Sequence, residues 1–339
     1  MADADVAVTT VPAPAAPIAP AGFEAIRDLQ RGQRSKGPMT PPHNNAMRCA
    51  DGACARSYPV VMGKPVLIDE ERSVFLHADY LVRATAASEA GALSGVKEWL
   101  RWLPSPSVNM SAIRCLARMR DMLLGRGGNH VVLVVGGGLR GKGVSQLVDA
   151  PGLRVINVDP APDSAAAVFC DAHDLPFADG SVDAVVVQAV LEHVADPWRC
   201  VDEIHRVLKP EGIVYSETPF MQQVHLRGYD FTRFSHIGHR RLFRRFAELE
   251  SGAVAGPGTA LAWAWRYFLA SFARSPRAAK VLFWIGRVTG IVIEQFDHLL
   301  KQRPGALDGA SCVFFLGTRS PRAISDRDVL AGYRGAQRS

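Results

Sequence analysis

An uninterrupted aliphatic run, Val131–Val135, passes directly into the glycine-rich segment 136–143 (GGGLRGKG) and then into a helical pattern that extends through Leu147. Such a run is typical of a strand that is buried on both faces of a parallel sheet. The glycines after it allow the backbone to approach a ligand closely, and the start of the following helix presents free N–H groups there. This strand, turn and helix constrain the fold more than any other feature of the chain.

The alternation of strand and helix continues beyond this point. Asp196 is predicted to cap a helix that has Pro197 in its first turn and an apolar face that extends to Leu208. Further strands are predicted at 154–158, 166–169, 182–187, 213–216 and, near the end of the chain, 312–318. Alternation at this density predicts an α/β fold with a doubly wound parallel sheet.

The rest of the chain is divided by composition and pattern. Two β-prone runs flank Met62-Gly63 and predict a small hairpin. We expect a disordered or polar leader at 1–46, the β-hairpin element at 47–80, a helical linker at 81–125, the α/β domain at 126–320 and a tail at 321–339.

Composition excludes several classes of protein. Apolar residues make up 48% of the 339 residues, which excludes a wholly disordered or fibrous chain. The most apolar stretch, Val281–Ile293, is too short for a membrane-spanning helix and is interrupted by Arg287. The six scattered cysteines indicate reduced thiols, and the first residues lack the basic cluster of a secretory signal. These features predict a cytoplasmic protein, with peripheral attachment to a membrane left open.

Charge is distributed unevenly along the chain. The net charge is +6, but the part from Val224 onward carries +10 and the part before it −4. A basic C-terminal part indicates a preference for anionic or membrane-associated partners on that side. Nucleic acid is the less favoured partner, because the basic residues are spread out and no nucleic-acid-binding motif accompanies them.

An acidic residue ends the second predicted strand. Asp159 follows Gly138 by 21 residues, where a carboxylate can accept hydrogen bonds from ribose hydroxyls. The glycine-rich turn and this carboxylate together predict a cofactor that contains adenosine. They do not distinguish NAD from other adenosine cofactors.

Three further motifs narrow the choice among adenosine-containing cofactors. Residues 170–183 (CDAHDLPFADGSVD), 190–197 (VLEHVADP) and 203–212 (EIHRVLKPEG) occur in this order. Together they resemble the class I S-adenosylmethionine-dependent methyltransferases that carry a type 11-like domain. The resemblance covers about residues 130–220 and weakens toward about 318. It implies a Rossmann-like sheet of order 3-2-1-4-5-7-6 with an antiparallel last strand, and S-adenosyl-L-methionine as cofactor.

The resemblance also implies roles for individual residues. Gly136 and Gly138 would form the turn against the methionine part of the cofactor, and Gln188 would lie near the sulfonium. The remaining roles fall to Asp159 at the ribose and to Asp171 with the backbone of Ala172 at the adenine edge. The chain departs from the family where an acidic residue is usual two positions before the first glycine, since Val134 stands there.

The acceptor side is expected to follow the fifth strand. Residues 229–236 (YDFTRFSH) resemble a stretch that caps the acceptor in a subset of these methyltransferases, and the cap with basic helices is expected at about 221–305. We hypothesise that His225 or Asp230 assists deprotonation of the acceptor. Alternatively, Asp230 pairs with Arg233 and holds the cap. Glu192-His193 lies at the sheet edge where open α/β sheets bind ligands, so a functional and a structural role both stay open.

Two segments remain ambiguous. The aromatic and basic stretches 261–269 and 281–300 are expected first as core helices, then as an interfacial membrane contact. Around Cys49 and Cys54, residues 47–68 resemble the zinc-ribbon-like leader of some bacterial methyltransferases. Since no second CxxC pair is present, a degenerate hairpin without metal is predicted, although His43 and His77 are candidate ligands.

These observations support a methyltransferase that acts on a small-molecule, sugar or lipid-linked acceptor. One alternative is a cofactor-binding or scaffold protein with reduced catalysis, suggested by the basic Arg140 and Lys142 in the glycine loop. Another is an NAD-dependent oxidoreductase, because Asp159 also suits NAD.

Overall fold

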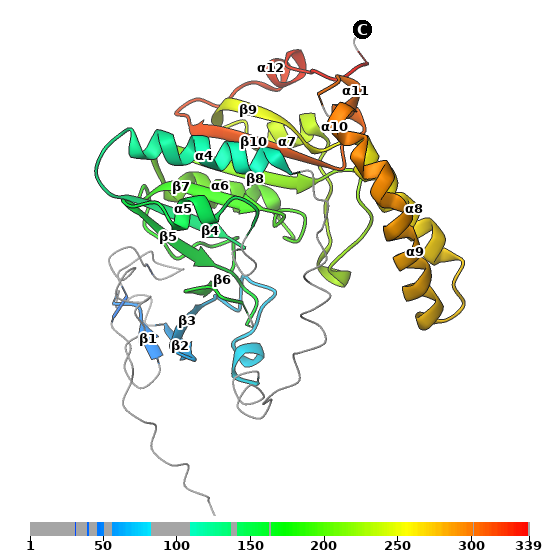
Figure 1. The fold of residues 1–339 in the computed structure, drawn as a ribbon. Coiled ribbons are helices and arrows are strands. Elements are labelled where there is room, and N and C mark those ends of the chain that lie inside the picture. The colour runs from blue at the N-terminus through cyan, green and yellow to red at the C-terminus, as the bar shows by residue number, and fades with distance from the viewer. Residues whose placement is uncertain are drawn as a thin grey trace, which may run out of the picture.

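A computed structural model gives the fold of the chain (Figure 1). It describes residues 31, 39–40, 46–50, 56–82, 109–136, 141–162, 164–300 and 302–337, and for Met110 and Arg227 only the backbone. The predicted leader lies almost entirely outside the described residues, as does the part of the predicted linker from 83 to 108.

A six-stranded sheet forms the centre of the domain. Its strands, in spatial order, are β5 (Leu153–Val158), β4 (His130–Val135), β7 (Val182–Gln188), β8 (Leu208–Pro219), β10 (Cys312–Arg319) and β9 (Phe246–Ala255). The first four are parallel, and β10 is antiparallel to both of its neighbours. The short β6 (Phe169–Cys170) continues the order beyond β5 through a parallel bridge between Val158 and Val168. This arrangement confirms the expected order 3-2-1-4-5-7-6 with an antiparallel last strand.

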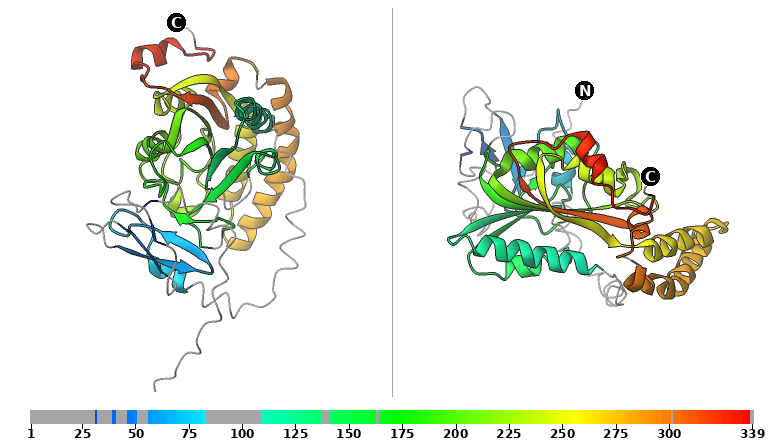
Figure 2. Two further views of the ribbon diagram at one scale, coloured as in Figure 1. Left: turned by 90° about the vertical axis from the view of Figure 1, so that its left-hand side faces the viewer. Right: turned by 90° about the horizontal axis from the view of Figure 1, so that it is seen from above.

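Helices cover both faces of this sheet (Figure 2). On one face lie α4 (Met110–Leu124) and α5 (Ser145–Val148), which pack on Val132 and Val134. On the other lie α6 (Pro197–Val207) and α7 (His236–Leu242), whose core cluster includes Leu133 and Val135. Neighbouring residues of β4 thus point into two separate cores, which is why the strand is aliphatic throughout.

The N-terminal element extends the sheet beyond β6. Its strands are β1 (Ala46–Arg48), β2 (Ser57–Val61) and β3 (Lys64–Leu67), and Met62-Gly63 forms the predicted turn. β3 pairs in parallel with β6, so the order of the small sheet is β1-β2-β3-β6. The hairpin therefore adds strands to the edge of the domain that carries Asp171.

The C-terminal half adds a helical hairpin and three short helices. α8 (Pro257–Ser271) and α9 (Pro276–Gln295) form the hairpin, which projects away from the sheet on the side opposite the N-terminal element (Figure 1). The short helices are α10 (Asp297–Leu300), α11 (Gly305–Asp308) and α12 (Asp326–Ala331), and a 3-10 turn, η1, covers Arg227–Tyr229. None of the described helices is long and apolar enough to span a membrane.

Small residues form the contact between α8 and α9. A Cβ on Gly286 would lie 2.8 Å from Arg266 Cα, and one on Gly290 would lie 3.2 Å from Ala262 Cβ. Tyr267 and Phe283 meet edge to face between the two helices, with ring centroids 5.6 Å apart. Many other large apolar side chains lie outside the contact, and six are more than half exposed: Leu261, Phe268, Phe272, Val281, Val288 and Val292. The expectation that these helices form core is therefore wrong, because the hairpin projects away from the sheet and these apolar side chains are exposed.

Candidate functional site

Four predicted or candidate site residues lie where parallel strands end. Gly136 follows β4, Asp159 follows β5, Gln188 ends β7 and Glu217 lies near the end of β8. The carboxyl ends of parallel strands share one edge of the sheet, and ligands of open α/β sheets bind at that edge. Gln188 and Glu217 are direct neighbours across the β7–β8 pair.

The turn after β4 admits only glycine. Gly136 has a φ of +70°, and a Cβ there would lie 2.3 Å from Val190 Cγ2. Its N–H donates to the carbonyl of Val158 at 2.8 Å, which ties the turn to β5. Gly138 lies outside the described residues. Gln188 packs against the far end of the loop, where its Nε2 lies 3.4 Å from the carbonyl oxygen of Lys142.

Glu217 is buried beside this turn. Its carboxylate accepts hydrogen bonds from the Tyr215 hydroxyl and from Asn109 Nδ2, at 3.1 and 3.2 Å for the two oxygens of the carboxylate. Burial raises the pKa of Glu217, although the hydrogen bonds from Tyr215, Asn109 and Gln188 act in the opposite direction. Asn109 also caps α4, so the helix and the ends of β7 and β8 meet at one carboxylate.

Asp159 begins the loop after β5. Its Oδ1 accepts a hydrogen bond from the N–H of Ala161 at 2.7 Å, and its own N–H donates to Val168 at 3.3 Å. The hydroxyl of Tyr80 donates to the next carbonyl, that of Pro160. The N-terminal element thus contacts the loop in which the resemblance places the ribose-binding carboxylate.

Asp171 is fully engaged with its own chain. Ser73 Oγ donates to Oδ2 at 2.5 Å, while the backbone N–H and Nδ1 of His173 contact Oδ1 at 2.9 and 2.6 Å. Burial would raise the pKa of Asp171, but the hydrogen bonds from His173 and Ser73 outweigh it and the pKa lies below its ordinary value. His173 Nε2 accepts from the N–H of Asp196 at 3.0 Å, which fixes the proton on Nδ1. Ala172 is buried within this network.

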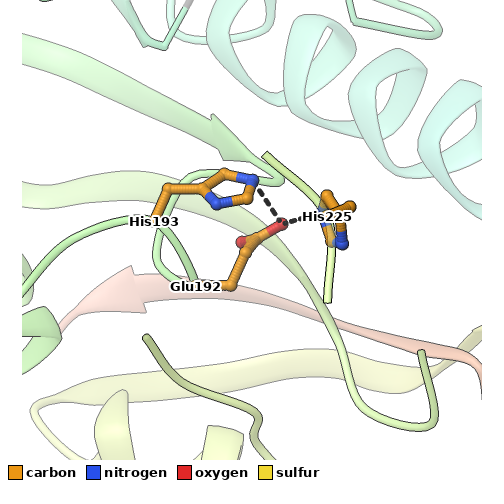
Figure 3. A group of neighbouring side chains, drawn as sticks. All are labelled: Glu192, His193 and His225. Carbon is orange, nitrogen blue, oxygen red and sulfur yellow. Dashed lines mark ion pairs between the residues drawn. The ribbon is translucent and has the colours of Figure 1, made fainter. Parts of the chain in front are cut away.

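A second cluster lies at the same edge, beyond β7 (Figure 3). Glu192 Oε1 is 3.6 Å from His193 Nε2 and 3.9 Å from His225 Nε2. Glu192 is completely buried, and neither carboxylate oxygen has a hydrogen-bond partner among the described residues. Burial raises the pKa of Glu192 to about 8, although Arg233 acts in the opposite direction. The loop after β8 brings His225 to this cluster.

Asp230 holds that loop. It accepts hydrogen bonds from both terminal nitrogens of Arg233, the Nη2 bond being 2.7 Å, and from the N–H of His225 at 2.6 Å. The hydrogen bonds from Arg233 lower the pKa of Asp230 to about 2. A carboxylate with so low a pKa is a weak base, and both oxygens are engaged. This geometry matches the alternative in which Asp230 pairs with Arg233 and holds the cap. It leaves His225 Nε2 directed at Glu192.

The cysteine element is only partly described. Cys54 and His43 lie outside the described residues. Cys49 is buried, and His77 Nε2 lies 3.0 Å from the carbonyl oxygen of Ile68. Within the described part of the chain, Cys49 and His77 belong to no group of three or more potential metal ligands, whereas Glu192, His193 and His225 form one.

Comparison with known proteins identifies the central part of the domain. Residues 133–216, from β4 to β8, match the family described as a methyltransferase domain. An uncharacterized methyltransferase of Mycolicibacterium gilvum is 41% identical over 131 residues, which cover 35% of this chain and 50% of that protein. A demethylmenaquinone methyltransferase of Clavibacter sepedonicus is 48% identical over 71 residues, 20% of this chain and 29% of that protein.

The chain spans about half or less of the length of these curated relatives. Among solved structures, phosphoethanolamine N-methyltransferase 2 of Haemonchus contortus in complex with S-adenosyl-L-methionine is 17% identical, with a TM-score of 0.38. The alignment covers 68% of this chain and 61% of that chain. A TM-score this low adds nothing about function. The matched domain and the sequence relatives are those of methyltransferases.

Proposed function

We propose that this chain is an S-adenosylmethionine-dependent methyltransferase whose acceptor binds between the carboxyl edge of the sheet and the loop that carries His225. The observation that carries the proposal is the meeting of Gly136, Gln188 and Glu217 at the ends of β4, β7 and β8, within the segment that matches the methyltransferase domain. This is the edge at which open α/β sheets bind their ligands.

The residues at this edge fit the cofactor. The turn at Gly136 has a positive φ and packs against Val190, so only glycine fits there, and we propose that its backbone faces the methionine part of the cofactor. Asp159 is placed to accept hydrogen bonds from ribose hydroxyls, as the resemblance implies. Asp171 acts by positioning: its buried network with His173 and Ser73 fixes the backbone at Ala172, which would contact the adenine edge of the cofactor.

A buried carboxylate also stands in for the acidic residue that the chain lacks at Val134. Glu217 lies at the same sheet edge, two strands from β4. We propose that its network with Asn109 and Gln188 faces the ammonium group of the cofactor's methionine part. Lys142, whose charge favours the ionised form of Glu217, would then face the cofactor's carboxylate.

In methyl transfer the protein mainly aligns the acceptor with the methyl group of the cofactor and forms no covalent bond itself. A lone pair of the acceptor attacks the methyl carbon in line with the sulfur–carbon bond, whose electron pair stays on sulfur as the neutral thioether. A hydroxyl acceptor also loses its proton. We assign this deprotonation to the cluster of Glu192, His193 and His225, because its side chains converge on one point and Asp230 is occupied by Arg233.

Calorimetry with S-adenosylmethionine, S-adenosylhomocysteine and NADH tests the cofactor assignment. We expect the first two to bind, and Asp159→Asn to weaken both at least about tenfold, since a hydrogen bond to a charged group contributes about 1.5–3 kcal/mol. Asp202→Asn is the matched control, because Asp202 pairs only at the surface with Arg245. Binding of NADH alone would refute the proposal and favour an oxidoreductase. Binding of both sulfur ligands without turnover on any acceptor would favour the scaffold alternative.

The acceptor side is tested by turnover at saturating cofactor. We expect His225→Ala to lower kcat by about 10²-fold, the lower end of what general acid–base groups contribute. His298→Ala is the control, because that side chain is exposed and far along the chain in α10. Unchanged turnover in His225→Ala would remove the cluster from the reaction.

The α8–α9 hairpin supports a membrane-associated acceptor. Residues 257–293 contain five basic and no acidic side chains, and Arg274 and Arg277 lie at the turn of the hairpin. The exposed apolar residues of α9 repeat at helical spacing, with Val281, Trp284 and Val288 on one side. A basic helix with an exposed apolar face is typical of attachment in the interface of an anionic membrane. We propose that the hairpin docks there.

Vesicle flotation tests this attachment. We expect binding to vesicles that contain phosphatidylglycerol and not to pure phosphatidylcholine, because each basic residue near an anionic surface contributes about 1 kcal/mol. Trp284→Ser should weaken binding several-fold, whereas Trp198→Ser, at a tryptophan of α6 that is somewhat more exposed, should not. A stable dimer in solution that is lost in Trp284→Ser, with no vesicle binding, would assign the face to a second copy of the chain instead.

The N-terminal element is proposed to be a degenerate zinc ribbon that serves as an added edge of the sheet. Its support is the parallel pairing of β3 with β6, which needs no metal. We expect the metal content of purified protein to be the same after Cys49→Ser and Cys54→Ser. Loss of one equivalent of zinc in either variant would show a metal site there.

A further inference from the structure

The Glu192–His193–His225 cluster has the composition of a metal site (Figure 3). One ligand atom from each residue lies within 4.8 Å of the other two. Two imidazoles and one carboxylate form the donor set of many zinc and other transition-metal sites, and they come here from two loops at the edge of the sheet. The side chains of His193 and His225 are 16% and 27% exposed, so a small ion reaches the cluster from solvent.

Contacts outside the cluster orient both rings. His193 Nδ1 lies 2.7 Å from the carbonyl oxygen of Tyr229, and His225 Nδ1 lies 3.2 Å from that of Gln223. A carbonyl only accepts, so in each ring the proton is on Nδ1 and the lone pair on Nε2. For His225 the carbonyl is nearer than Arg233 Nη2, at 3.5 Å. A backbone carbonyl behind a ligating histidine is the usual arrangement in metal sites.

The burial of Glu192 is a second observation, independent of the donor set, that points to a bound cation. Its side chain is completely buried and points at the two Nε2 atoms, and neither oxygen has a hydrogen-bond partner among the described residues. A buried carboxyl group without a hydrogen-bond partner is costly whether or not it is ionised, because buried polar groups are as a rule hydrogen-bonded or bound to metal. Arg233, whose positive charge acts on Glu192, donates its hydrogen bonds to Asp230 instead. A cation between the three side chains would supply the missing partner.

We propose that Glu192, His193 and His225 bind one divalent transition-metal cation of the zinc type, with at least one coordination position left open. Bonds of about 2.0–2.1 Å to each ligand place tetrahedral ligands about 3.3 Å apart. The two separations from Glu192 Oε1 are 3.6 and 3.9 Å. Small side-chain movements of the exposed histidines therefore close the site.

The open coordination position of the cation would bind the methyl acceptor, and this step rests on the proposed function. An acceptor oxygen that coordinates the cation would have a lowered pKa and would release its proton to solvent water, which reaches the cluster beside the partly exposed histidines. His225 then acts as a ligand, and the cation favours acceptors with a hydroxyl group over amines that hold no acidic proton.

The test uses the full-length protein after removal of metal by a chelator. Calorimetry with Zn²⁺ alone should give one site that is weakened at least tenfold in Glu192→Gln and in His193→Asn, and unchanged in His298→Asn. Co²⁺ should give d–d absorption without a thiolate charge-transfer band, which separates this site from Cys49 and Cys54. Circular dichroism checks folding of each variant, and His225→Asn replaces any variant that does not fold.

Two results would overturn the proposal: no binding of Zn²⁺ or Co²⁺ by the wild-type protein, or binding that none of the three ligand variants weakens. Failure of the proposed function gives a different pattern. Metal would then bind as described while S-adenosylmethionine does not. Conversely, cofactor binding and methyl transfer by the metal-free protein at the full rate would leave the proposed function standing and refute the role of the cation.

Discussion

His236 fixes α7 to the sheet in its neutral form. His236 is buried, and its Nε2 lies 2.9 Å from Ser251 Oγ and 3.3 Å from Arg334 Nη2. Since a guanidinium only donates, this nitrogen must present a lone pair. Burial, together with the charges of Arg334 and Arg240, lowers the pKa of His236 from 6.5 to about 4. Acid should therefore loosen the contact between α7 and β9.

The size of the effect follows from proton linkage. In the unfolded chain His236 binds a proton below pH 6.5, whereas in the folded chain it does so only below about pH 4. The unfolded state binds more protons in this window, so the contribution of His236 to stability is complete above pH 6.5 and is lost as the pH falls toward 4. A pKa difference of about 2.5 at about 1.4 kcal/mol per unit gives roughly 3 kcal/mol.

Urea denaturation followed by tryptophan fluorescence at pH values between 7 and 4 measures this loss. Between pH 7 and pH 4 the free energy of unfolding should fall by roughly 3 kcal/mol less in His236→Gln than in wild type, because glutamine keeps an acceptor but does not titrate. His298→Gln, at an exposed histidine, should follow wild type. Parallel curves for His236→Gln and wild type would show that His236 is protonated in the folded protein and would refute the reasoning.

Three further outcomes are expected, each measured against wild type. Arg233→Ala leaves the buried carboxylate of Asp230 without its partner and should lower the free energy of unfolding by about 3 kcal/mol. Arg244→Ala, at the surface, should change it by less than about 0.5 kcal/mol. Equal urea midpoints for the two variants would contradict this. Gly136→Ala combines a positive φ with a clash and should cost at least about 2 kcal/mol, while Gly228→Ala, with open space around it, should be nearly neutral. Ser73→Ala removes a hydrogen bond to a buried carboxylate, so limited proteolysis of the N-terminal element should be about tenfold faster; an unchanged rate would show that this bond does not hold the element.

Five of the six strands of the central sheet could be predicted because each carries its own local signal, whereas β9 (Phe246–Ala255) lies in the segment that was expected to form the acceptor cap. The predicted run Val131–Val135 lies within β4, and the predicted 312–318 lies within β10. The cap at Asp196 is confirmed by a hydrogen bond from Arg199 N at 3.1 Å to its side chain. Strand order came from the resemblance, since composition and spacing along one chain do not specify which strands are neighbours.

The site was less predictable because its contacts join residues far apart in sequence. Glu217 meets Asn109 across 108 positions, and Asp171 meets Ser73 across 98. Nothing near either acid indicates such a partner. Glu192 and His193 form a visible motif, but only the loop after β8 brings His225 to them. The exposed face of α9 was misjudged for a related reason, because an apolar stripe at helical spacing looks the same on a buried and an exposed helix.

Because β3 pairs in parallel with β6, the stability of the N-terminal element is linked to the binding of a ligand by the loops at the sheet edge. Ser73 and Tyr80 of the N-terminal element contact Asp171 and the carbonyl of Pro160, in the two loops assigned to the cofactor. A ligand that orders these loops must also tighten the element, by the same free energy with which the element improves binding of the ligand. If the proposed cofactor site is correct, a protein or modification that binds the N-terminal element at β1 would change the affinity for the cofactor without contacting the pocket.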